Sequence, residues 1–316
     1  MRAFALIAGL IPLLLGAPAA AGVDHTHLQV LERRIIDTAA QNSGDYGMAV
    51  MDLETGVVVG VNGNRAYPMA STVKIAVAAA YLNQVDLGIR KLDDGIGTST
   101  AYALMERMMI HSDNGATDQL IRALGGPVIV NAWLQSNGIA GVRMDRTIAQ
   151  LLAARRDLYE QYDSATPIGM LTMLRKIDKG EVLRPASREV LLDMMRRCAT
   201  GRNRIRGMMP TDAVVEHKTG TLNNYSSDVG FITTPNGNRV AVVFFARGGA
   251  NRPAVIATAA RAIYDTFSIP TRTIAPIQIA EAVPPSGELT PVRPPAQVGD
   301  GRVYTSATYS GAPQER

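Results

Sequence analysis

Strand-like segments occur in two groups that lie far apart along this chain of 316 residues, and their separation is the strongest constraint on the fold. Two β-rich segments lie near the N-terminus and three near the C-terminus, with helical patterns between the two groups. The five segments are residues 46–51, 57–61, 213–218, 227–233 and 239–247. The simplest arrangement of these segments is one antiparallel sheet of five strands.

Helical segments complete the predicted architecture. Helical patterns over residues 27–40 and 253–267 place one helix before the first strand and one after the last. The helical segments between the two groups of strands form a second, all-helical lobe. We therefore expect an α/β (α+β) domain over residues 22–270, with the sheet flanked by the N- and C-terminal helices. The α/β lobe comprises residues 22–67 and 213–270, and the helical lobe comprises residues 68–212.

The two ends of the chain differ in composition from the part between them. A basic residue, an apolar run and the small residues Ala19 to Ala21 predict a cleaved signal peptide over residues 1–21. We therefore expect a periplasmic or secreted protein with no stable membrane span after cleavage, since the apolar run is short for a transmembrane helix. A tail rich in Pro, Ala, Ser and Gly, residues 271–316, is predicted to be disordered or to form a linker that spans the cell wall.

Composition limits the partners and cofactors of the chain. The formal net charge of +4 is too small to indicate a nucleic acid as a partner, and the chain has only 5% aromatic residues for stacking. Cys198 is the only cysteine, so an internal disulfide is impossible, and no Cys/His spacing predicts a metal site. We expect no metal and no cofactor, a small molecule as the partner, and a monomer.

The segment from Pro68 to Leu82 places two reactive side chains one turn apart. Because Ile75 to Leu82 is rich in alanine and free of glycine and proline, we expect a long helix that begins near Ser71. Residues three apart lie on one face of a helix, so the Ser71 hydroxyl would lie beside the Lys74 amine. A serine becomes a nucleophile when a neighbouring base takes its proton, and a lysine can be that base when its charge is suppressed.

Two further strings follow at junctions that the predicted topology would bring to the same region. A Ser-Asp-Asn string at residues 112–114 stands at a break between helical segments, and a Lys-Thr-Gly string at residues 218–220 stands at the end of the first late strand. Each string alone could be a helix cap or a strand end. Together with Ser71 and Lys74, and in this order, they indicate a catalytic site.

With these three strings the chain resembles the penicillin-recognising serine enzymes, which are class A β-lactamases and penicillin-binding proteins. The resemblance extends from about Leu31 to Phe267 and is closest to class A. It implies a β-lactamase/transpeptidase-like fold and an acyl-enzyme mechanism. In that mechanism Ser71 attacks an amide carbonyl, and Ser112 passes a proton to the leaving nitrogen. Lys74 is the base, and its proton affinity is lowered by burial and by the Lys218 cation.

The resemblance also assigns the residues that hold the substrate. The backbone N–H groups of Ser71 and Thr221 would form an oxyanion hole, and Asn114 would hold the side-chain amide of the substrate. Lys218, Thr219 and Arg204 would bind the substrate carboxylate, and Gly220 is a further substrate-binding residue. The assignment of Arg204 is the least specific of these, because residues 202 and 206 are also arginines.

Residues 143–164, which are charged and predicted to be irregular, resemble the class A Ω-loop but depart from it at one important position. An Arg–Asp pair clamps the ends of that loop, and here the pair would be Arg146 and Asp163. In class A the loop carries a glutamate that activates water for deacylation. That position is Ile148 in this chain, and an isoleucine side chain cannot accept a proton. Leu152 replaces the asparagine of the family, and the loop is somewhat longer than the resemblance implies.

The chain is therefore predicted to have the groups for acylation and to lack the usual group for deacylation. Gln150 could position a water without deprotonating it, and Glu160 stands near the opposite end of the loop. Small class A-like D,D-peptidases also lack the glutamate, so we favour peptidoglycan stem peptides ending in D-Ala-D-Ala, with slow hydrolysis of β-lactams. The alternatives are a true β-lactamase with another water-activating group and a penicillin-binding or peptidoglycan-sensing protein without turnover.

Overall fold

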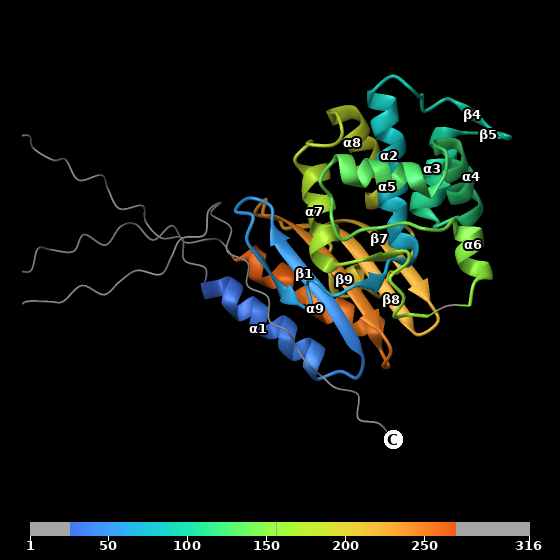
Figure 1. Cartoon of the computed structure of the whole chain (residues 1–316). Helices are drawn as coiled ribbons and strands as arrows, with labels where there is room; N and C mark the ends of the chain where they lie inside the picture. Colours follow the sequence, from blue (N-terminus) through green and yellow to red (C-terminus); the bar gives the residue numbers. More distant parts are fainter. Residues whose placement is uncertain (1–25, 156, 270–316) are drawn as a thin grey trace, which may run out of the picture.

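The computed structural model describes residues 26–155 and 157–269, which form three layers: one central sheet and a layer of helices on each of its faces (Figure 1). Helices α1 (Thr26–Ala40) and α9 (Arg252–Ser268) cover one face of the sheet, and the other helices lie over the opposite face. No helix within the described ranges is long and apolar enough to cross a membrane. The predicted signal peptide, residues 1–21, and the predicted tail, residues 271–316, lie outside the described residues.

The central sheet has five antiparallel strands in the order β2-β1-β9-β8-β7. Its strands are β1 (Asp45–Asp52), β2 (Val58–Val61), β7 (Val214–Leu222), β8 (Tyr225–Thr233) and β9 (Arg239–Arg247). The N-terminal hairpin joins the three late strands because β1 pairs with β9 along its whole length. The predicted α/β (α+β) architecture with one five-stranded antiparallel sheet is confirmed.

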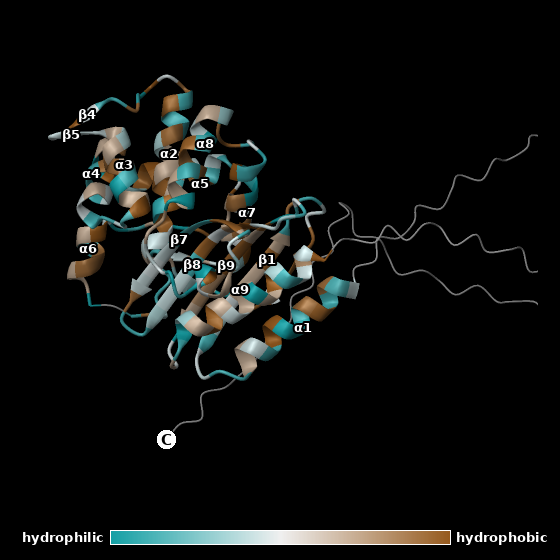
Figure 2. Cartoon of the chain, turned by 180° about the vertical axis from the view of Figure 1, so that it is seen from behind, coloured by the Kyte–Doolittle hydropathy of each residue, from teal (hydrophilic) through white to brown (hydrophobic). Residues whose placement is uncertain are grey.

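Both faces of the sheet are buried, which explains the long apolar runs in its strands. Successive side chains of β9 alternate between two cores: Val243 and Phe245 point into the core below the helical lobe, and Val242 and Phe244 into the core below α1 and α9. Helix α1 carries both apolar and polar residues (Figure 2), and Leu31 on its apolar side is fully buried in the second core.

The helical lobe covers the opposite face of the sheet. Its helices are α2 (Lys74–Asp86), α3 (Ala101–Ile110), α4 (Asn114–Leu124), α5 (Pro127–Ser136), α6 (Ile148–Ala153), α7 (Pro167–Asp178) and α8 (Pro185–Arg196). Helix α2 lies among the others (Figure 1), and its residues from Lys74 to Leu82 are all at most 2% exposed. A helix buried on all sides requires neighbours on all sides, so α2 is the central element of this lobe.

Two predictions of local structure were wrong. The segment 143–164 is not irregular throughout, because α6 lies within it and is stabilised at its start by a capping box between Thr147 and Gln150. The Lys-Thr-Gly string does not end its strand, because β7 continues to Leu222 and pairs with β8 over its whole length. The pairing with β8 is not encoded in the local pattern of β7, whereas the Thr147–Gln150 capping box is a local signature that the sequence prediction overlooked.

Candidate active site

Ser71 lies in a strained turn between the short strand β3 (Tyr67–Pro68) and α2. The turn is a 3-10 helix, η1 (Ala70–Val73), so the regular helix begins one turn later than predicted. Ala70 has a φ of +50°, a conformation that costs about 1–3 kcal/mol for a residue other than glycine. The surrounding structure stabilises this turn, since the Met69 carbonyl oxygen accepts a hydrogen bond of 2.7 Å from the Thr72 hydroxyl.

The 3-10 geometry brings Ser71 and Lys74 to the same side of the turn. Side chains three residues apart eclipse each other in a 3-10 helix, and the Lys74 backbone N–H donates to the Ser71 carbonyl oxygen. Within the described residues the Ser71 hydroxyl has no hydrogen-bond partner, and the residue is partly exposed. Its oxygen is therefore accessible to a substrate.

Lys74 is fully buried, and its ammonium group reaches the Ser-Asp-Asn string rather than Ser71. It donates to the Ser112 carbonyl oxygen at 2.7 Å, to the Ser112 hydroxyl at 3.1 Å and to the Asn114 side-chain oxygen at 2.8 Å. The structure thus brings together two of the three strings that the sequence analysis singled out, although they are 38 and 40 residues apart in the chain.

The environment of Lys74 favours its neutral form. Burial is the largest cause, and the Lys218 cation adds to it, so that the pKa of Lys74 is lowered to about 7. Asp113 and Asp118 act in the opposite direction and favour the charged form. A substantial fraction of Lys74 is therefore uncharged at neutral pH and able to accept a proton.

The loop before α4 holds Ser112 in an unusual conformation. Ser112 has a φ of +60° and is half-buried, and the next residue caps the helix, since the Asp113 carboxylate accepts the Ala116 N–H at 2.8 Å. A non-glycine residue with positive φ is uncommon, and such strain often marks a functional segment. This conformation directs both oxygens of Ser112 to Lys74.

Strand β7 brings the Lys-Thr-Gly string against the turn that carries Ser71. A Cβ atom added at Gly220 would lie 2.8 Å from the Ala70 Cβ and 2.8 Å from the Met69 carbonyl oxygen, so only glycine allows this approach. From β8, the Ser227 hydroxyl donates to the same Met69 carbonyl oxygen at 3.3 Å. The strand and the turn are therefore in direct contact.

Lys218 is fully buried and donates to the carbonyl oxygen of Thr219 at 3.0 Å. Burial lowers the pKa of Lys218 to about 8, while Cys198 and Asp228 favour its charged form and Arg204 opposes it. The Thr219 hydroxyl lies 2.5 Å from the Thr200 hydroxyl. Lys218 therefore keeps much of its positive charge at neutral pH.

The structure distinguishes Arg204 from the two arginines beside it. Arg204 is 7% exposed, and its guanidinium donates to the Gly220 and Ser227 carbonyl oxygens, both at 2.8 Å, and to the Thr221 hydroxyl at 2.6 Å. Its Nε atom is buried without a partner among the described residues. Arg202 is exposed, so Arg204 is the arginine of this segment that lies beside Gly220 and the exposed Thr221.

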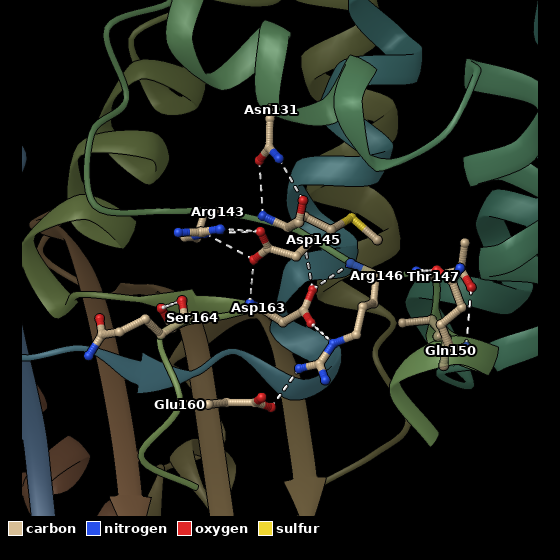
Figure 3. Close-up of polar contacts among 12 residues, drawn as sticks. Asn131, Arg143, Asp145, Arg146, Thr147, Gln150, Glu160, Asp163 and Ser164 are labelled. Carbon is tan, nitrogen blue, oxygen red and sulfur yellow. Dashed lines mark hydrogen bonds and ion pairs between the residues drawn. The ribbon is translucent and has the colours of Figure 1, made fainter. Parts of the chain in front are cut away.

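The ends of the Ω-loop are held together by an ion pair between Arg146 and Asp163, whose Nε and Oδ2 atoms are 2.5 Å apart (Figure 3). Arg146 also pairs with Glu160 at 2.5 Å, so Glu160 is a third member of this clamp and is not free to activate water. The Asp163 carboxylate accepts the Asp145 N–H at 2.7 Å, and the Asp145 carboxylate accepts the Asp163 N–H at 2.8 Å. This clamp closes the loop at its base.

Ile148 and Leu152 occupy opposite environments on α6. The Ile148 side chain is 6% exposed and belongs to the core below the helical lobe, whereas Leu152 is 60% exposed. Gln150 is engaged in the capping box, since its side-chain oxygen accepts the Thr147 N–H at 2.9 Å (Figure 3). The position expected for a deacylating carboxylate therefore holds the buried, apolar side chain of Ile148.

The sequence analysis did not single out Asp118, whose carboxylate accepts the Ile148 N–H at 2.7 Å and the Ala149 N–H at 2.9 Å. A signal was available, because Asp118 follows Asn114 by four residues and therefore shares its face of α4.

The sequence analysis also missed the buried pair of His217 and Asp228. The His217 Nδ1 atom lies 2.7 Å from the Asp228 Oδ1 atom. The described ranges contain no group of His, Cys, Asp and Glu side chains that could hold a metal ion.

Comparisons with known sequences agree with the resemblance noted above. A family model described as a β-lactamase enzyme family matches residues 30–267. The chain is 28% identical over 289 residues to β-lactamase OXY-2 of Klebsiella oxytoca, with 83% of this chain and 97% of that protein covered. It is 26% identical over 243 residues to β-lactamase VEB-1 of Pseudomonas aeruginosa, with 68% and 81% covered.

Solved structures give the same result. The described fold matches a β-lactamase from Chitinophaga pinensis with a TM-score of 0.70 and 29% identity, covering 75% of this chain and 98% of that chain. It matches a class A β-lactamase of the last common ancestor of Gram-negative bacteria with a TM-score of 0.70 and 33% identity, covering 75% and 99%. Both matches cover nearly the whole of the known structure.

Proposed function

The chain belongs to the class A β-lactamase family of serine hydrolases, and within this family we propose that it forms an acyl-enzyme at Ser71 readily and releases the acyl group slowly. The acyl donors are β-lactams and peptides that end in D-Ala-D-Ala, and D,D-peptidase-like chemistry is the favoured activity. The signal-like N-terminus supports a periplasmic or secreted location, where stem peptides of the cell wall occur.

The grouping of Ser71, Lys74, Ser112 and Lys218 supports acylation. In the proposed step the Ser71 oxygen attacks the amide carbonyl carbon while its proton passes to the neutral Lys74 amine. The backbone N–H groups of Ser71 and Thr221 stabilise the negative charge that develops on the carbonyl oxygen. The C–N bond then breaks, and the proton returns from Lys74 through the Ser112 hydroxyl to the leaving nitrogen. The contact of 3.1 Å between Lys74 and that hydroxyl supports this route.

The cluster around Arg204 supports recognition of a carboxylate next to the reacting amide. β-Lactams and stem peptides both carry such a carboxylate. The cationic groups near Gly220 are Lys218 and Arg204, and the Arg204 guanidinium donates to the Gly220 carbonyl oxygen and to the hydroxyl of the exposed Thr221. Their positive charge would favour a carboxylate that binds beside Thr221.

The buried Ile148 side chain is the single observation that carries the proposal of slow release. Hydrolysis of the acyl-enzyme ester needs a base that removes a proton from water, and three Ω-loop carboxylates are engaged: Asp145 and Asp163 bond to each other's backbone, and Glu160 pairs with Arg146. The fourth, exposed Asp157, accepts the Tyr159 N–H at 2.9 Å and does not occupy the family's glutamate position. Without such a base the ester should persist. A peptidase can still function in this way, because its acyl group can pass to an amine or slowly to water.

Parallel assays of two reactions test the proposed substrate. The purified protein is incubated with benzylpenicillin and with a peptide ending in D-Ala-D-Ala, and β-lactam hydrolysis and D-Ala release are measured against Ser71→Ala. We expect D-Ala release over many turnovers, slow penicillin hydrolysis, and neither reaction in the variant. Absence of D-Ala release would contradict the peptidase assignment, and a trapped adduct without turnover of either the penicillin or the peptide would indicate a sensor.

A true β-lactamase is the second candidate, because the similar proteins and structures named above are described as β-lactamases. This function requires a water-activating group other than an Ω-loop glutamate. Rapid penicillin hydrolysis without D-Ala release would establish it in place of the favoured activity.

A further inference from the structure

A buried histidine lies on the face of β7 that carries the proposed carboxylate-binding residues. Successive side chains of a strand point to opposite faces, so His217, Thr219 and Thr221 share one face. The chain segment that leads into the 3-10 helix η2 (Ile205–Met208) contacts this face, because Arg204 donates to the Thr221 hydroxyl at 2.6 Å. His217 is completely buried, and the proposed acylation steps do not use it.

Each ring nitrogen of His217 has a partner on a neighbouring element. The Nδ1 atom lies 2.7 Å from the Asp228 Oδ1 atom on β8, and the Arg206 Nε–H on η2 donates to the Nε2 atom at 3.1 Å. Asp228 is also completely buried. The imidazole therefore connects an arginine on one side to a buried carboxylate on the other.

These two partners determine which nitrogen of His217 carries the proton. A guanidinium group only donates hydrogen bonds, so Nε2 must be free to accept, and a carboxylate accepts, so Nδ1 must carry the proton. A second proton, on Nε2, would set two N–H groups and two positive charges against each other. A phenylalanine in place of His217 would leave the Asp228 Oδ1 atom without a donor and the Arg206 Nε atom without an acceptor.

The same contacts hold the two residues that follow Arg204 in the chain. The second carboxylate oxygen of Asp228 accepts the Ile205 N–H at 3.1 Å, and Arg206 also donates to the Val215 carbonyl oxygen at 2.9 Å. The backbone directly after Arg204 is thus fixed to β8 through Asp228 and to β7 through His217 and Val215. The position of the Arg204 guanidinium beside Thr221 depends on this backbone, because its side chain starts from it.

We propose that His217, with its proton on Nδ1, is a positioning residue for the recognition of the substrate carboxylate. It joins Arg206 to Asp228 and thereby holds the segment that presents Arg204 to the carboxylate. His217 takes no part in the proton transfers of acylation and does not touch the substrate. This inference rests on the proposed function, in which Arg204 binds the carboxylate of the acyl donor.

The position of the proton can be measured in the unmodified protein. Long-range ¹H–¹⁵N NMR distinguishes the two neutral forms of an imidazole from each other and from the cation. The chain has four histidines, and His25→Gln, His27→Gln and His111→Gln identify the signals of the other three. We expect His217 to carry a single proton, on Nδ1, at neutral pH. A proton on Nε2, alone or in addition, would overturn the proposal, because Arg206 could not donate to that atom.

Acylation of His217→Phe by two donors tests the effect on recognition. Phenylalanine keeps an aromatic ring at this position and removes both hydrogen bonds. Acylation by benzylpenicillin should slow by about 10-fold, whereas acylation by its methyl ester, which has no charged carboxylate, should change by less than about twofold. An equal loss with both donors, or no loss with either, would contradict the proposed role.

Arg206→Met is a milder test of the same connection, because it leaves a neutral ring nitrogen without a partner rather than a buried carboxylate. This variant should reproduce the selective loss with benzylpenicillin. When it is combined with His217→Phe, the total loss should be smaller than the product of the two single losses, since both residues act through one contact. Losses that multiply fully would show that His217 does not act through Arg206.

Tyr46→Phe is the matched control. Tyr46 belongs to the same core as Ile205, and its hydroxyl donates to the Ser43 carbonyl oxygen at 2.8 Å, away from the segment that carries Arg204. This variant should leave the ratio of the two acylation rates unchanged, and an equal change of the ratio would show that loss of any hydrogen bond in this core has the effect. Failure of every β-lactam to react would overturn the proposed function. Normal acylation with an unchanged ratio in His217→Phe and Arg206→Met would overturn this inference alone.

Discussion

Lys74 and Lys218 are the two fully buried lysines among the described residues, and each has a lowered pKa for the same main reason, which is burial. Their proposed tasks require opposite protonation states. Lys74 must be neutral to take the proton of Ser71, whereas Lys218 must be charged to attract a carboxylate. The pKa values of about 7 and about 8 leave a narrow interval in which both conditions hold.

The rate of acylation should therefore follow a bell-shaped pH profile. It should rise through about pH 7 as Lys74 loses its proton and fall above about pH 8 as Lys218 loses its charge. Stopped-flow measurement with a chromogenic cephalosporin between about pH 5 and about pH 10 gives the profile. A rate that is constant across this range would contradict the assigned roles.

Arg204→Ala should slow acylation by carboxylate-bearing β-lactams by about 10- to 100-fold, because hydrogen bonds to a charged group contribute about 1.5–3 kcal/mol. Exposed Arg202 provides the control, and Arg202→Ala should change the rate by less than about twofold. Acylation by a methyl ester of the same β-lactam distinguishes a loss of carboxylate binding from a general defect in folding, because the ester has no charged carboxylate. An equally large loss with the ester would show that Arg204 does not recognise the carboxylate.

At the scale of residues, the sequence predicts functional residues that stand together in a short motif. It misses residues that come into contact only in the folded structure. Ser112 and Asn114 could be assigned because they stand in a recognisable order after Ser71 and Lys74. Arg204 could not be separated from its neighbours, because only burial beside Gly220 and Thr221 distinguishes it. The contact of Asp118 with Ile148 spans 30 residues and has no local pattern.

At the scale of elements, the site depends on the contact between β7 and the 3-10 turn that carries Ser71. Gly220→Ala would place a methyl group 2.8 Å from the Ala70 Cβ and the Met69 carbonyl oxygen. We expect a loss of about 1–3 kcal/mol in the free energy of unfolding, together with slower acylation, because the strand and the turn must move apart. Chemical denaturation and acylation kinetics measure the two effects.

Gly95→Ala is the control for that substitution. A Cβ atom at Gly95 would have no neighbour within 4 Å, so this variant should stay within about 0.5 kcal/mol of the parent. If the two variants behave alike, close contact at Gly220 is not what positions the turn.

Elements with a strong hydrophobic periodicity of their own could be predicted from the sequence. Elements that are stabilised by contacts with distant residues could not. The continuous apolar run and length of β9 and the apolar stripe of α1 are visible in the sequence. Helix α6 was missed although its capping box is visible in the sequence, because the helix has only six residues and depends also on the distant Asp118. The extension of β7 to Leu222 was missed because it depends on pairing with β8.

At the scale of the whole molecule, the sheet separates two cores. One core lies below the helical lobe and surrounds the candidate site, and the other lies below α1 and α9. The presence of five strands and flanking helices follows from the sequence. The strand order, with β1 between β2 and β9, does not, because it depends on pairing between residues about 200 positions apart, such as Asp45 with Arg247.

Leu31→Ala tests the separation of the two cores. Leu31 is fully buried in the core on the α1 side, so the substitution should lower the free energy of unfolding by about 2–5 kcal/mol, measured by urea denaturation. Acylation of the molecules that remain folded should be unchanged. A changed acylation rate in folded protein would show that the two cores are coupled across the sheet.

The central claim is that Ser71 is acylated quickly and deacylated slowly because Ile148 occupies the position of the deacylating carboxylate. Intact-mass measurement after rapid quenching of the protein with benzylpenicillin follows both steps in one experiment. We predict one covalent adduct per chain, located on Ser71 by peptide mapping, which persists after free penicillin is removed. Rapid multiple turnover of penicillin without any trapped adduct would contradict the claim.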